Sequence, residues 1–280
     1  MGDANTMKSY KQHSKKVFLV LILLIIFVSK TSYSSDEKIK AVILAEDAFP
    51  PFSSLNGGFS NEVVVAAFKA SGVKVSLEVY PFSRLMMMVK SGTAAGGFNA
   101  IPTTDNENQF LFGKYPIYVS QQRFYYSVDD PVVINTEEDI FEKLVKQDIV
   151  VGDVRGYIYP PAFELLKSQT AKNGRNLIYT DTVKSDEKLI KKLLLGRNRV
   201  ALMHSEVASL HIKNMNIEDK IRFGNFAWEA PLYIAFSKVN PNASFLIEAF
   251  DKGMEVIIDN GVYDYLLKKY SLDTPSIYIR

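Results

Sequence analysis

The 280-residue chain contains no cysteine. A disulfide framework, a thiol nucleophile and thiolate metal sites are therefore excluded. Lipid anchoring at the cleavage point of an exported lipoprotein is excluded as well, because that attachment needs a cysteine. We therefore expect an exported form of this protein to be free in its compartment and not lipidated.

The signature motifs of common enzyme classes are also missing. The sequence has no Gly-x-Ser-x-Gly, no His-Glu-x-x-His, no phosphate-binding loop and no Gly-x-Gly-x-x-Gly. Of its three histidines, His204 and His211 lack the usual spacing of metal ligands, and no carboxylate cluster supports them. We therefore expect no enzymatic activity, no cofactor and no metal site.

A run of twelve apolar residues at 17–28 is too short to span a membrane easily. As a helix it would rise ~18 Å, against ~30 Å for the hydrocarbon core. Lys11, Lys15 and Lys16 lie in the preceding segment, and small polar residues follow at 29–35. This layout is typical of a secretory signal peptide, which we expect to be cleaved after Ser34. An uncleaved anchor is the alternative interpretation.

Removing residues 1–34 changes the charge of the chain. The segment carries five lysines and one aspartate, so the formal net charge moves from +2 to −2. A mildly acidic globule is not expected to bind nucleic acid. With 47% hydrophobic residues in the whole chain, the protein can bury a large core.

Strand patterns and helix patterns alternate twice along the chain, without an obvious internal repeat. In the first series, expected strands at 39–45, 73–79 and 96–101 are separated by two expected helices. The second series has the same character, with expected strands at 148–153, 177–179 and 200–203 and helices at 161–168, 185–196 and 206–212. The alternation predicts an α/β fold with mainly parallel sheets.

Two points divide the chain into lobes. Residues 129–131 (Asp-Asp-Pro) separate the two series, and a second crossing is expected near residues 228–231. The expected organisation is a signal peptide at 1–34, lobe 1 at 35–129, lobe 2 at 130–229, and a return to lobe 1 at 230–280. Two connecting strands would form a hinge, and a cleft between lobes is a natural ligand site.

Several motifs in this order resemble a known family. Pro50-Pro51-Phe52 follows the first strand, Pro81-Phe82-Ser83-Arg84 precedes the second helix, and LLLGRNRVALMHSEVA occupies residues 193–208. Together they resemble the family 3 extracellular solute-binding proteins, which are type II periplasmic binding proteins of ABC importers. The resemblance covers nearly all of residues 38–272.

The resemblance implies both a fold and a function. The fold is two-lobed, and each lobe is a mainly parallel sheet flanked by helices and joined to the other by a two-strand hinge. The function is capture of a small polar solute, an amino acid or related organic acid, in the periplasm for the membrane permease of an ABC importer. We expect a monomer that does not bind nucleic acid.

The departures from the family concern the ligand. Family members that bind amino acids carry an arginine for the ligand carboxylate, and Asn106 stands at that position here. An aspartate for the ligand ammonium is replaced by His204, or by Ser205 if the alignment shifts. Both ends of the usual amino-acid clamp are therefore missing, which argues against the standard ligand.

The candidate ligand-binding residues follow strands, because ligands gather at the carboxyl ends of parallel sheets. Alternatives are a core cap for Phe52, a helix N-cap for Thr103 and a surface charge for Arg155. The full set is Asp47, Phe49, Phe52, Asn99, Thr103, Asn106, Arg155, Tyr157 and His204.

Two other functions fit the same scaffold. One is a dehydratase-like enzyme acting on a cyclic acid, which turnover of a bound ligand would reveal. The other is a sensor input protein that passes its signal to a separate partner.

Overall fold

The computed structural model describes residues 40–46, 48–169 and 177–275. The expected signal peptide at 1–34 lies outside the described residues. Within these residues, no helix combines the length and apolar character needed to cross a membrane.

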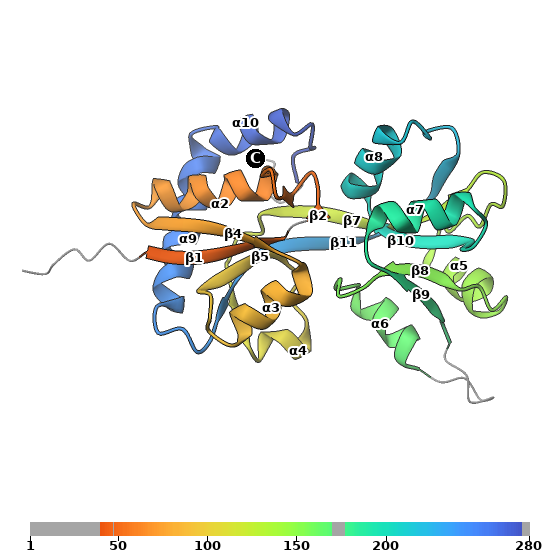
Figure 1. Ribbon diagram of the computed structural model, residues 1–280, viewed down its shortest axis with the longest axis horizontal. Helices are drawn as coiled ribbons and strands as arrows, with labels where there is room; N and C mark the ends of the chain where they lie inside the picture. Colours follow the sequence, from red (N-terminus) through yellow and green to blue (C-terminus); the bar gives the residue numbers. More distant parts are fainter. Residues whose placement is uncertain (1–39, 47, 170–176, 276–280) are drawn as a thin grey trace, which may run out of the picture. The chain divides into compact units, whose positions relative to one another are not determined.

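The first lobe is a parallel sheet with helices on both sides. Strand β1 (Lys40–Glu46) pairs in parallel with β4 (Lys74–Tyr80) and with β5 (Gly96–Ala100). The connecting helices α2 (Phe59–Ala70) and α3 (Phe82–Lys90) lie on opposite sides of the sheet (Figure 1). All five residues of β5 are buried, as its Gly-Gly-Phe-Asn-Ala sequence suggests for a central strand.

The second lobe repeats this arrangement. Strand β8 (Val151–Val154) pairs in parallel with β9 (Thr180–Val183) and with β10 (Val200–His204). Helix α6 (Pro161–Ser168) precedes β9, α7 (Asp186–Leu194) precedes β10, and α8 (Ser205–Asn214) follows it. Ser185 caps α7 by accepting a hydrogen bond from the Lys188 backbone N–H at 3.5 Å.

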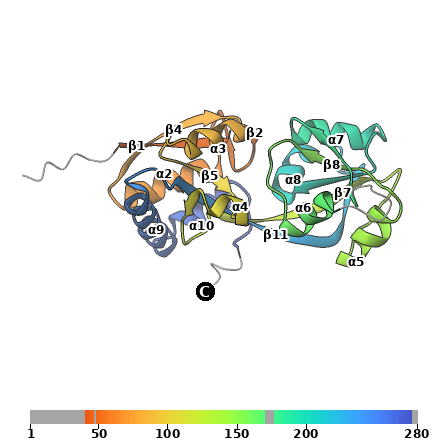
Figure 2. The same ribbon diagram turned by 90° about the horizontal axis from the view of Figure 1, so that it is seen from below.

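Two long antiparallel strands connect the lobes. Strand β7 (Tyr118–Ser127) and strand β11 (Ile221–Ser237) pair with each other, and the strand order of the sheet is β4-β1-β5-β11-β7-β10-β8-β9. The chain therefore passes from lobe 1 to lobe 2 along β7 and returns along β11, as Figure 2 also shows. The expected two-strand connection is confirmed.

The remaining elements belong to lobe 1 and to the segment that follows β7 in lobe 2. Helices α9 (Ala243–Asp259) and α10 (Val262–Lys269) pack against α2. The short elements are β2 (Ala48–Phe49), β3 (Ser53–Ser54), α4 (Thr104–Glu107), β6 (Phe110–Phe112), α5 (Glu137–Asp139) and the π-helix η1 (Ile140–Val145).

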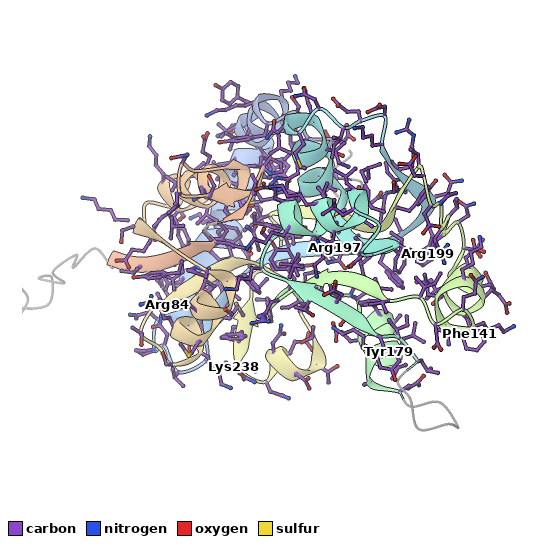
Figure 3. The ribbon with its side chains drawn as sticks, turned by 45° about the vertical axis from the view of Figure 1, so that its right-hand side comes forward. Arg84, Phe141, Tyr179, Arg197, Arg199 and Lys238 are labelled. Carbon is purple, nitrogen blue, oxygen red and sulfur yellow. The ribbon has the colours of Figure 1, made fainter. Side chains whose placement is uncertain are left out.

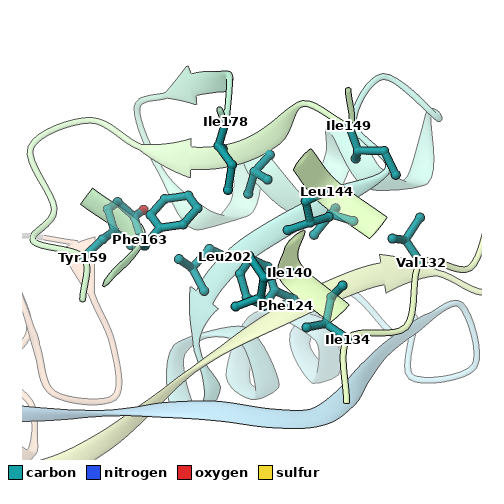
Figure 4. Close-up of a cluster of buried hydrophobic side chains, with 12 residues drawn as sticks. Phe124, Val132, Ile134, Ile140, Leu144, Ile149, Tyr159, Phe163, Ile178 and Leu202 are labelled. Atoms are coloured by element: carbon teal, nitrogen blue, oxygen red, sulfur yellow. The ribbon is translucent and has the colours of Figure 1, made fainter. Parts of the chain in front are cut away.

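Each lobe has its own hydrophobic core. In lobe 1, Leu44 of β1 packs with Leu85 and Val89 of α3. In lobe 2, Phe124, Phe163 and Leu202 belong to a cluster of twelve buried side chains (Figure 4). Because the cores are separate, the lobes are joined through β7 and β11 and through the contacts described below.

One expected strand has different bounds in the structure. The strand expected at 177–179 begins only at Thr180, because Ile178 reaches the core from a bend and Tyr179 is 41% exposed. The second crossing between the lobes was expected near residues 228–231, and β11 runs through these residues without interruption, with Pro231 opposite Val119 of β7. The proposed lobe boundaries at 129/130 and 229/230 stay a prediction.

Candidate functional site

A small cavity lies where the carboxyl ends of strands from both lobes meet. Its volume is about 20 Å³. Lobe 1 contributes the end of β1, the start of α3 and the end of β5, and lobe 2 contributes the loop after β8 and the end of β10. The lining residues are Glu46, Phe49, Phe82, Asn99, Ile101, Tyr157, Ile158 and His204.

Aromatic rings carry the contact between the lobes at this cavity. The Phe49 ring of lobe 1 meets His204 edge-on at 5.1 Å between centroids and Tyr157 at 5.6 Å. Phe82 approaches Tyr157 at 6.4 Å. Edge-to-face packing of this kind adds ~0.5–1.5 kcal/mol per pair beyond area burial. The two lobes are therefore in direct contact across the site.

The position of Phe49 is set by its own loop. Phe52 is fully buried and stacks on Phe49 at 5.2 Å, and the chain turns between them with the Phe52 N–H donating to the Phe49 carbonyl at 2.9 Å. Gly58 allows the start of α2 to approach this turn, because a Cβ there would lie 2.3 Å from the Phe52 carbonyl oxygen. Packing against Phe52 and the start of α2 thus holds the Phe49 side chain at the cavity.

His204 is fixed by hydrogen bonds on both ring nitrogens. Gln122 donates from Nε2 to His204 Nε2 at 2.8 Å and to the Ile158 carbonyl at 3.2 Å. His204 Nδ1 lies 2.9 Å from Ser120 Oγ, and the Ser120 hydroxyl donates to Glu206. Because the Ser120 proton goes to Glu206, the hydroxyl oxygen accepts from His204, and the imidazole carries its proton on Nδ1.

The imidazole is neutral at physiological pH. Burial lowers the pKa of His204 from 6.5 to about 3, because a buried site disfavours the charged form. Both ring nitrogens are already engaged, so His204 has no lone pair left to take a proton from a ligand. His204 therefore lines the cavity as a neutral side chain.

A buried carboxylate lies behind Tyr157. The Tyr157 hydroxyl donates to Asp186 Oδ2 at 3.1 Å, and Asp186 is 2% exposed. Burial raises the pKa of Asp186 from 3.8 to about 6, although the hydrogen bond from Tyr157 opposes the change. Burial and the nearby carboxylates of Asp186 and Glu46 raise the pKa of Tyr157 well above 10. Acidic groups from both lobes, Glu46 of β1 and Asp186 of α7, therefore act on Tyr157.

Asn99 occupies the end of β5 with a positive φ of 63°. Asparagine tolerates this left-handed conformation better than most residues. Its Nδ2 donates to Ser53 Oγ at 3.1 Å, while its buried Oδ1 has no hydrogen-bond partner. The backbone thus aims a polar side chain into the cavity.

A larger groove adjoins the small cavity. Its volume is about 680 Å³, and it runs between α4 of lobe 1 and α6 of lobe 2. Tyr157 and Ile158 line both spaces, so the cavity and the groove adjoin at these two residues. Thr103 and Asp105 form one wall, and Glu164 lies on the other.

The sequence-predicted site residues have different positions in the structure. Phe49, Asn99, Tyr157 and His204 line the small cavity, and Thr103 lines the groove.

Three candidates are placed elsewhere. Phe52 lies behind Phe49 in the core. Asn106 closes a capping box with Thr103, accepting at 2.8 Å and also donating to Ile101 at 2.8 Å, so both ends of its amide are used. Arg155 is exposed in the turn after β8 and lines neither space. Asp47 lies outside the described residues.

With this geometry established, the chain can be compared with known proteins. Residues 41–273 match the bacterial extracellular solute-binding proteins, family 3. The chain belongs to this family. The expected fold class and the resemblance of residues 38–272 are both confirmed.

Solved structures similar to this family member have low sequence identity to it. The arginine-, lysine-, histidine-binding protein of Geobacillus stearothermophilus is 19% identical, with a TM-score of 0.67 over 85% of this chain and 98% of that one. A histidine kinase sensor domain with similarity to periplasmic binding proteins is 15% identical, with a TM-score of 0.69 over 85% and 100%.

A third structure is an ancestral amino acid-binding protein described as a precursor of cyclohexadienyl dehydratase. It is 20% identical, with a TM-score of 0.62 over 82% of this chain and 95% of that one. At these identities the similarities show the fold alone. A search of curated proteins gave no match.

Sequence reasoning missed several lining residues of this family member. Glu46 is the first polar residue after the apolar strand, a signal that could have identified it. Phe82 was named only as part of a motif, and Asp186, which lies behind Tyr157, was not singled out. No group of three or more histidine, aspartate or glutamate side chains in the described part of the chain could hold a metal ion.

Proposed function

We propose that the protein captures a small polar solute between its two lobes, outside the cytoplasm, for the membrane permease of an ABC-type importer. The observation that carries the proposal is the convergence of polar and aromatic side chains from both lobes on one cavity. Glu46, Phe49 and Asn99 come from lobe 1, and Tyr157 and His204 from lobe 2. A ligand there contacts both lobes at once.

Opening and closing of the lobes is part of the proposal. A cavity of about 20 Å³ has room for one water-sized group, so a whole solute enters only when the lobes separate. Bending of β7 and β11 would separate them without disturbing either core. A solute that contacts both lobes favours the closed form by its differential affinity.

We propose binding without catalysis. The neutral His204 already uses both ring nitrogens, which removes the most obvious general base. The family is extracellular, which agrees with the signal peptide expected at 1–34. The dehydratase-like and sensor functions stay as alternatives: turnover of a bound ligand would favour the first, and an uncleaved N-terminal anchor the second.

Thermal denaturation of the purified protein with a panel of amino acids, organic acids and amines tests the proposal. A ligand at 100 times its Kd stabilises the folded state by ~2.7 kcal/mol. For a protein of this size that corresponds to a rise in Tm of roughly 5–10 °C.

The variant Phe49→Leu should lose at least half of the ligand-induced shift. Phe141→Leu is the matched control, because Phe141 is 48% exposed in lobe 2 (Figure 3). A full ligand-induced shift in Phe49→Leu would show that the solute binds elsewhere.

A further inference from the structure

The small cavity also indicates which class of solute the site takes, an inference that rests on the proposed function. Its volume of about 20 Å³ exceeds the roughly 10–15 Å³ needed for a water molecule. A carboxylate or a branched group does not fit in that space, whereas a single ammonium group has the size of a water molecule. The cavity therefore suits the head of a ligand, and the adjoining groove its remainder.

Hydrogen-bond acceptors are in surplus around the cavity. Asn99 Oδ1, Gln122 Oε1 and Asp186 Oδ1 are buried and have no hydrogen-bond partner. The orientation of the Gln122 amide is fixed, because both of its protons are donated, to the Ile158 carbonyl and to His204. Asn99 lines the cavity itself, and Gln122 and Asp186 contact the lining residues His204 and Tyr157. Asn99 is the one of these three residues that lines the cavity, and its unpaired Oδ1 favours a ligand that brings an N–H donor.

Among the described residues, the charged side chain that lines the cavity is acidic. Glu46 lines it and is 4% exposed, and Asp186 lies behind Tyr157. The lining among the described residues contains no lysine or arginine. His204 does not supply a positive charge either, because burial lowers its pKa to about 3. A carboxylate ligand would find no cationic partner here, whereas a cation would meet at least one carboxylate.

Aromatic side chains complete the walls. Phe49, Phe82 and Tyr157 surround the cavity from both lobes, with centroid distances of 5.6 Å and 6.4 Å from Tyr157 to the two phenylalanines. Aromatic groups attract cations through the negative potential of their ring faces. The groove beside Tyr157 and Ile158 offers about 680 Å³ for a carbon chain. Asp105, Glu164 and Lys167 line it, and the Lys167 ammonium pairs with Glu164 at 3.2 Å.

We propose that the solute is a primary amine whose ammonium group occupies the small cavity against Glu46 and Asn99, with its carbon chain in the groove. No carboxylate on the ligand is required. This assignment agrees with the loss of the amino-acid clamp, since Asn106 uses both ends of its amide within α4 and Arg155 is exposed.

Isothermal titration calorimetry of the wild-type protein with small probes of matched size tests the assignment of the solute as a primary amine. The probes are n-butylamine, 1,4-diaminobutane, n-butanol, butyrate, L-glutamine and tetramethylammonium. The two amines should bind at least tenfold more tightly than n-butanol, which has the same size as butylamine but no charge. Butyrate should not bind, and tetramethylammonium, which is too large for the cavity, should bind at least tenfold more weakly than butylamine.

A charge-neutralising variant locates the ammonium group. Glu46→Gln should weaken amine binding at least tenfold, whereas Glu248→Gln, an exposed carboxylate on α9, should leave it unchanged. If Glu46→Gln does not fold, the wild-type comparison of butylamine with butanol decides the question.

The outcomes separate the two proposals. Binding of L-glutamine or butyrate without binding of the amines would overturn the amine assignment and leave solute capture standing. Equal binding of butylamine and butanol, or undiminished amine binding by a folded Glu46→Gln variant, would also overturn it. Failure of every probe and of every compound in the wider panel to bind would contradict solute capture itself.

Discussion

Replacing the buried Asp186 by asparagine should stabilise the protein at neutral pH. In the folded state burial raises the Asp186 pKa from 3.8 to about 6, so the folded protein binds this proton more tightly than the unfolded chain. A raised folded-state pKa means that stability is present at low pH and is lost as the pH rises from 3.8 to 6. The difference of about 2 pKa units corresponds to a cost of about 3 kcal/mol at pH 7.5.

The Asp186→Asn variant avoids this cost and can keep the local contacts. The asparagine carbonyl can still accept from the Tyr157 hydroxyl, which lies 3.1 Å from Asp186 Oδ2, and Ser185 still caps α7. The unfolding free energy from urea titration should rise by up to about 3 kcal/mol at pH 7.5. At pH 5 the gain should shrink to about half, because the folded wild type is then mostly protonated at Asp186.

The control is Asp219→Asn, which changes the same charge at an exposed position near the end of α8. It should change the stability by less than ~0.5 kcal/mol at both pH values. The reasoning is refuted if Asp186→Asn is no more stable than wild type at pH 7.5, or if its advantage does not decrease toward pH 5.

Three further substitutions, measured by urea unfolding, test the burial of His204, the hydrogen bond of Tyr159 and the packing of α9 against α2. Burial lowers the folded-state pKa of His204 to about 3, so the unfolding free energy of the wild type should fall by up to ~1.4 kcal/mol per pH unit below pH 6.5. His204→Gln should flatten this dependence of the unfolding free energy on pH between pH 6 and 4, and it should reduce the stability at pH 7. Tyr159→Phe should cost ~1–3 kcal/mol, because the Tyr159 hydroxyl accepts from the buried Val154 N–H at 2.7 Å; an unchanged midpoint would contradict this. Gly253→Ala should destabilise by ~1–3 kcal/mol, since the new Cβ would lie 1.9 Å from the Ala67 carbonyl oxygen of α2. Helix propensity alone favours alanine by ~1 kcal/mol, so a stabilised Gly253→Ala variant would refute the close approach of α9 to α2.

Local patterns in the sequence were sufficient for most of the fold. The helix expected at 161–168 coincides with α6, because Pro160 and Pro161 mark its start and the apolar spacing marks its inner face. The strand expected at 177–179 was wrong because apolar character alone does not separate a strand from a buried bend. Ile178 is buried in the lobe 2 core, yet the pairing with β8 starts at Thr180.

The sequence predicts the position of the candidate site only through the ends of the expected strands. Phe49, Asn99, Tyr157 and His204 were chosen as candidates because ligand sites gather at the carboxyl ends of parallel strands, and all four line the small cavity. Their partners were not predictable, since Gln122 lies 82 residues from His204 in sequence and Asp186 lies 29 residues from Tyr157. The same limit explains Asn106: it stands at the family's arginine position, but no sequence pattern revealed that its amide is used in a cap.

The central claim, that a solute is held by closure of the two lobes, can be measured by energy transfer between them. Lys90 in lobe 1 and Lys184 in lobe 2 are both exposed, and each can be replaced by cysteine. Because the chain has no cysteine of its own, fluorophores then attach only at these two positions. A ligand that raises the Tm should convert an open population of low transfer efficiency into a single population of high efficiency. A ligand that stabilises the protein and leaves the distribution of transfer efficiencies unchanged would contradict the account.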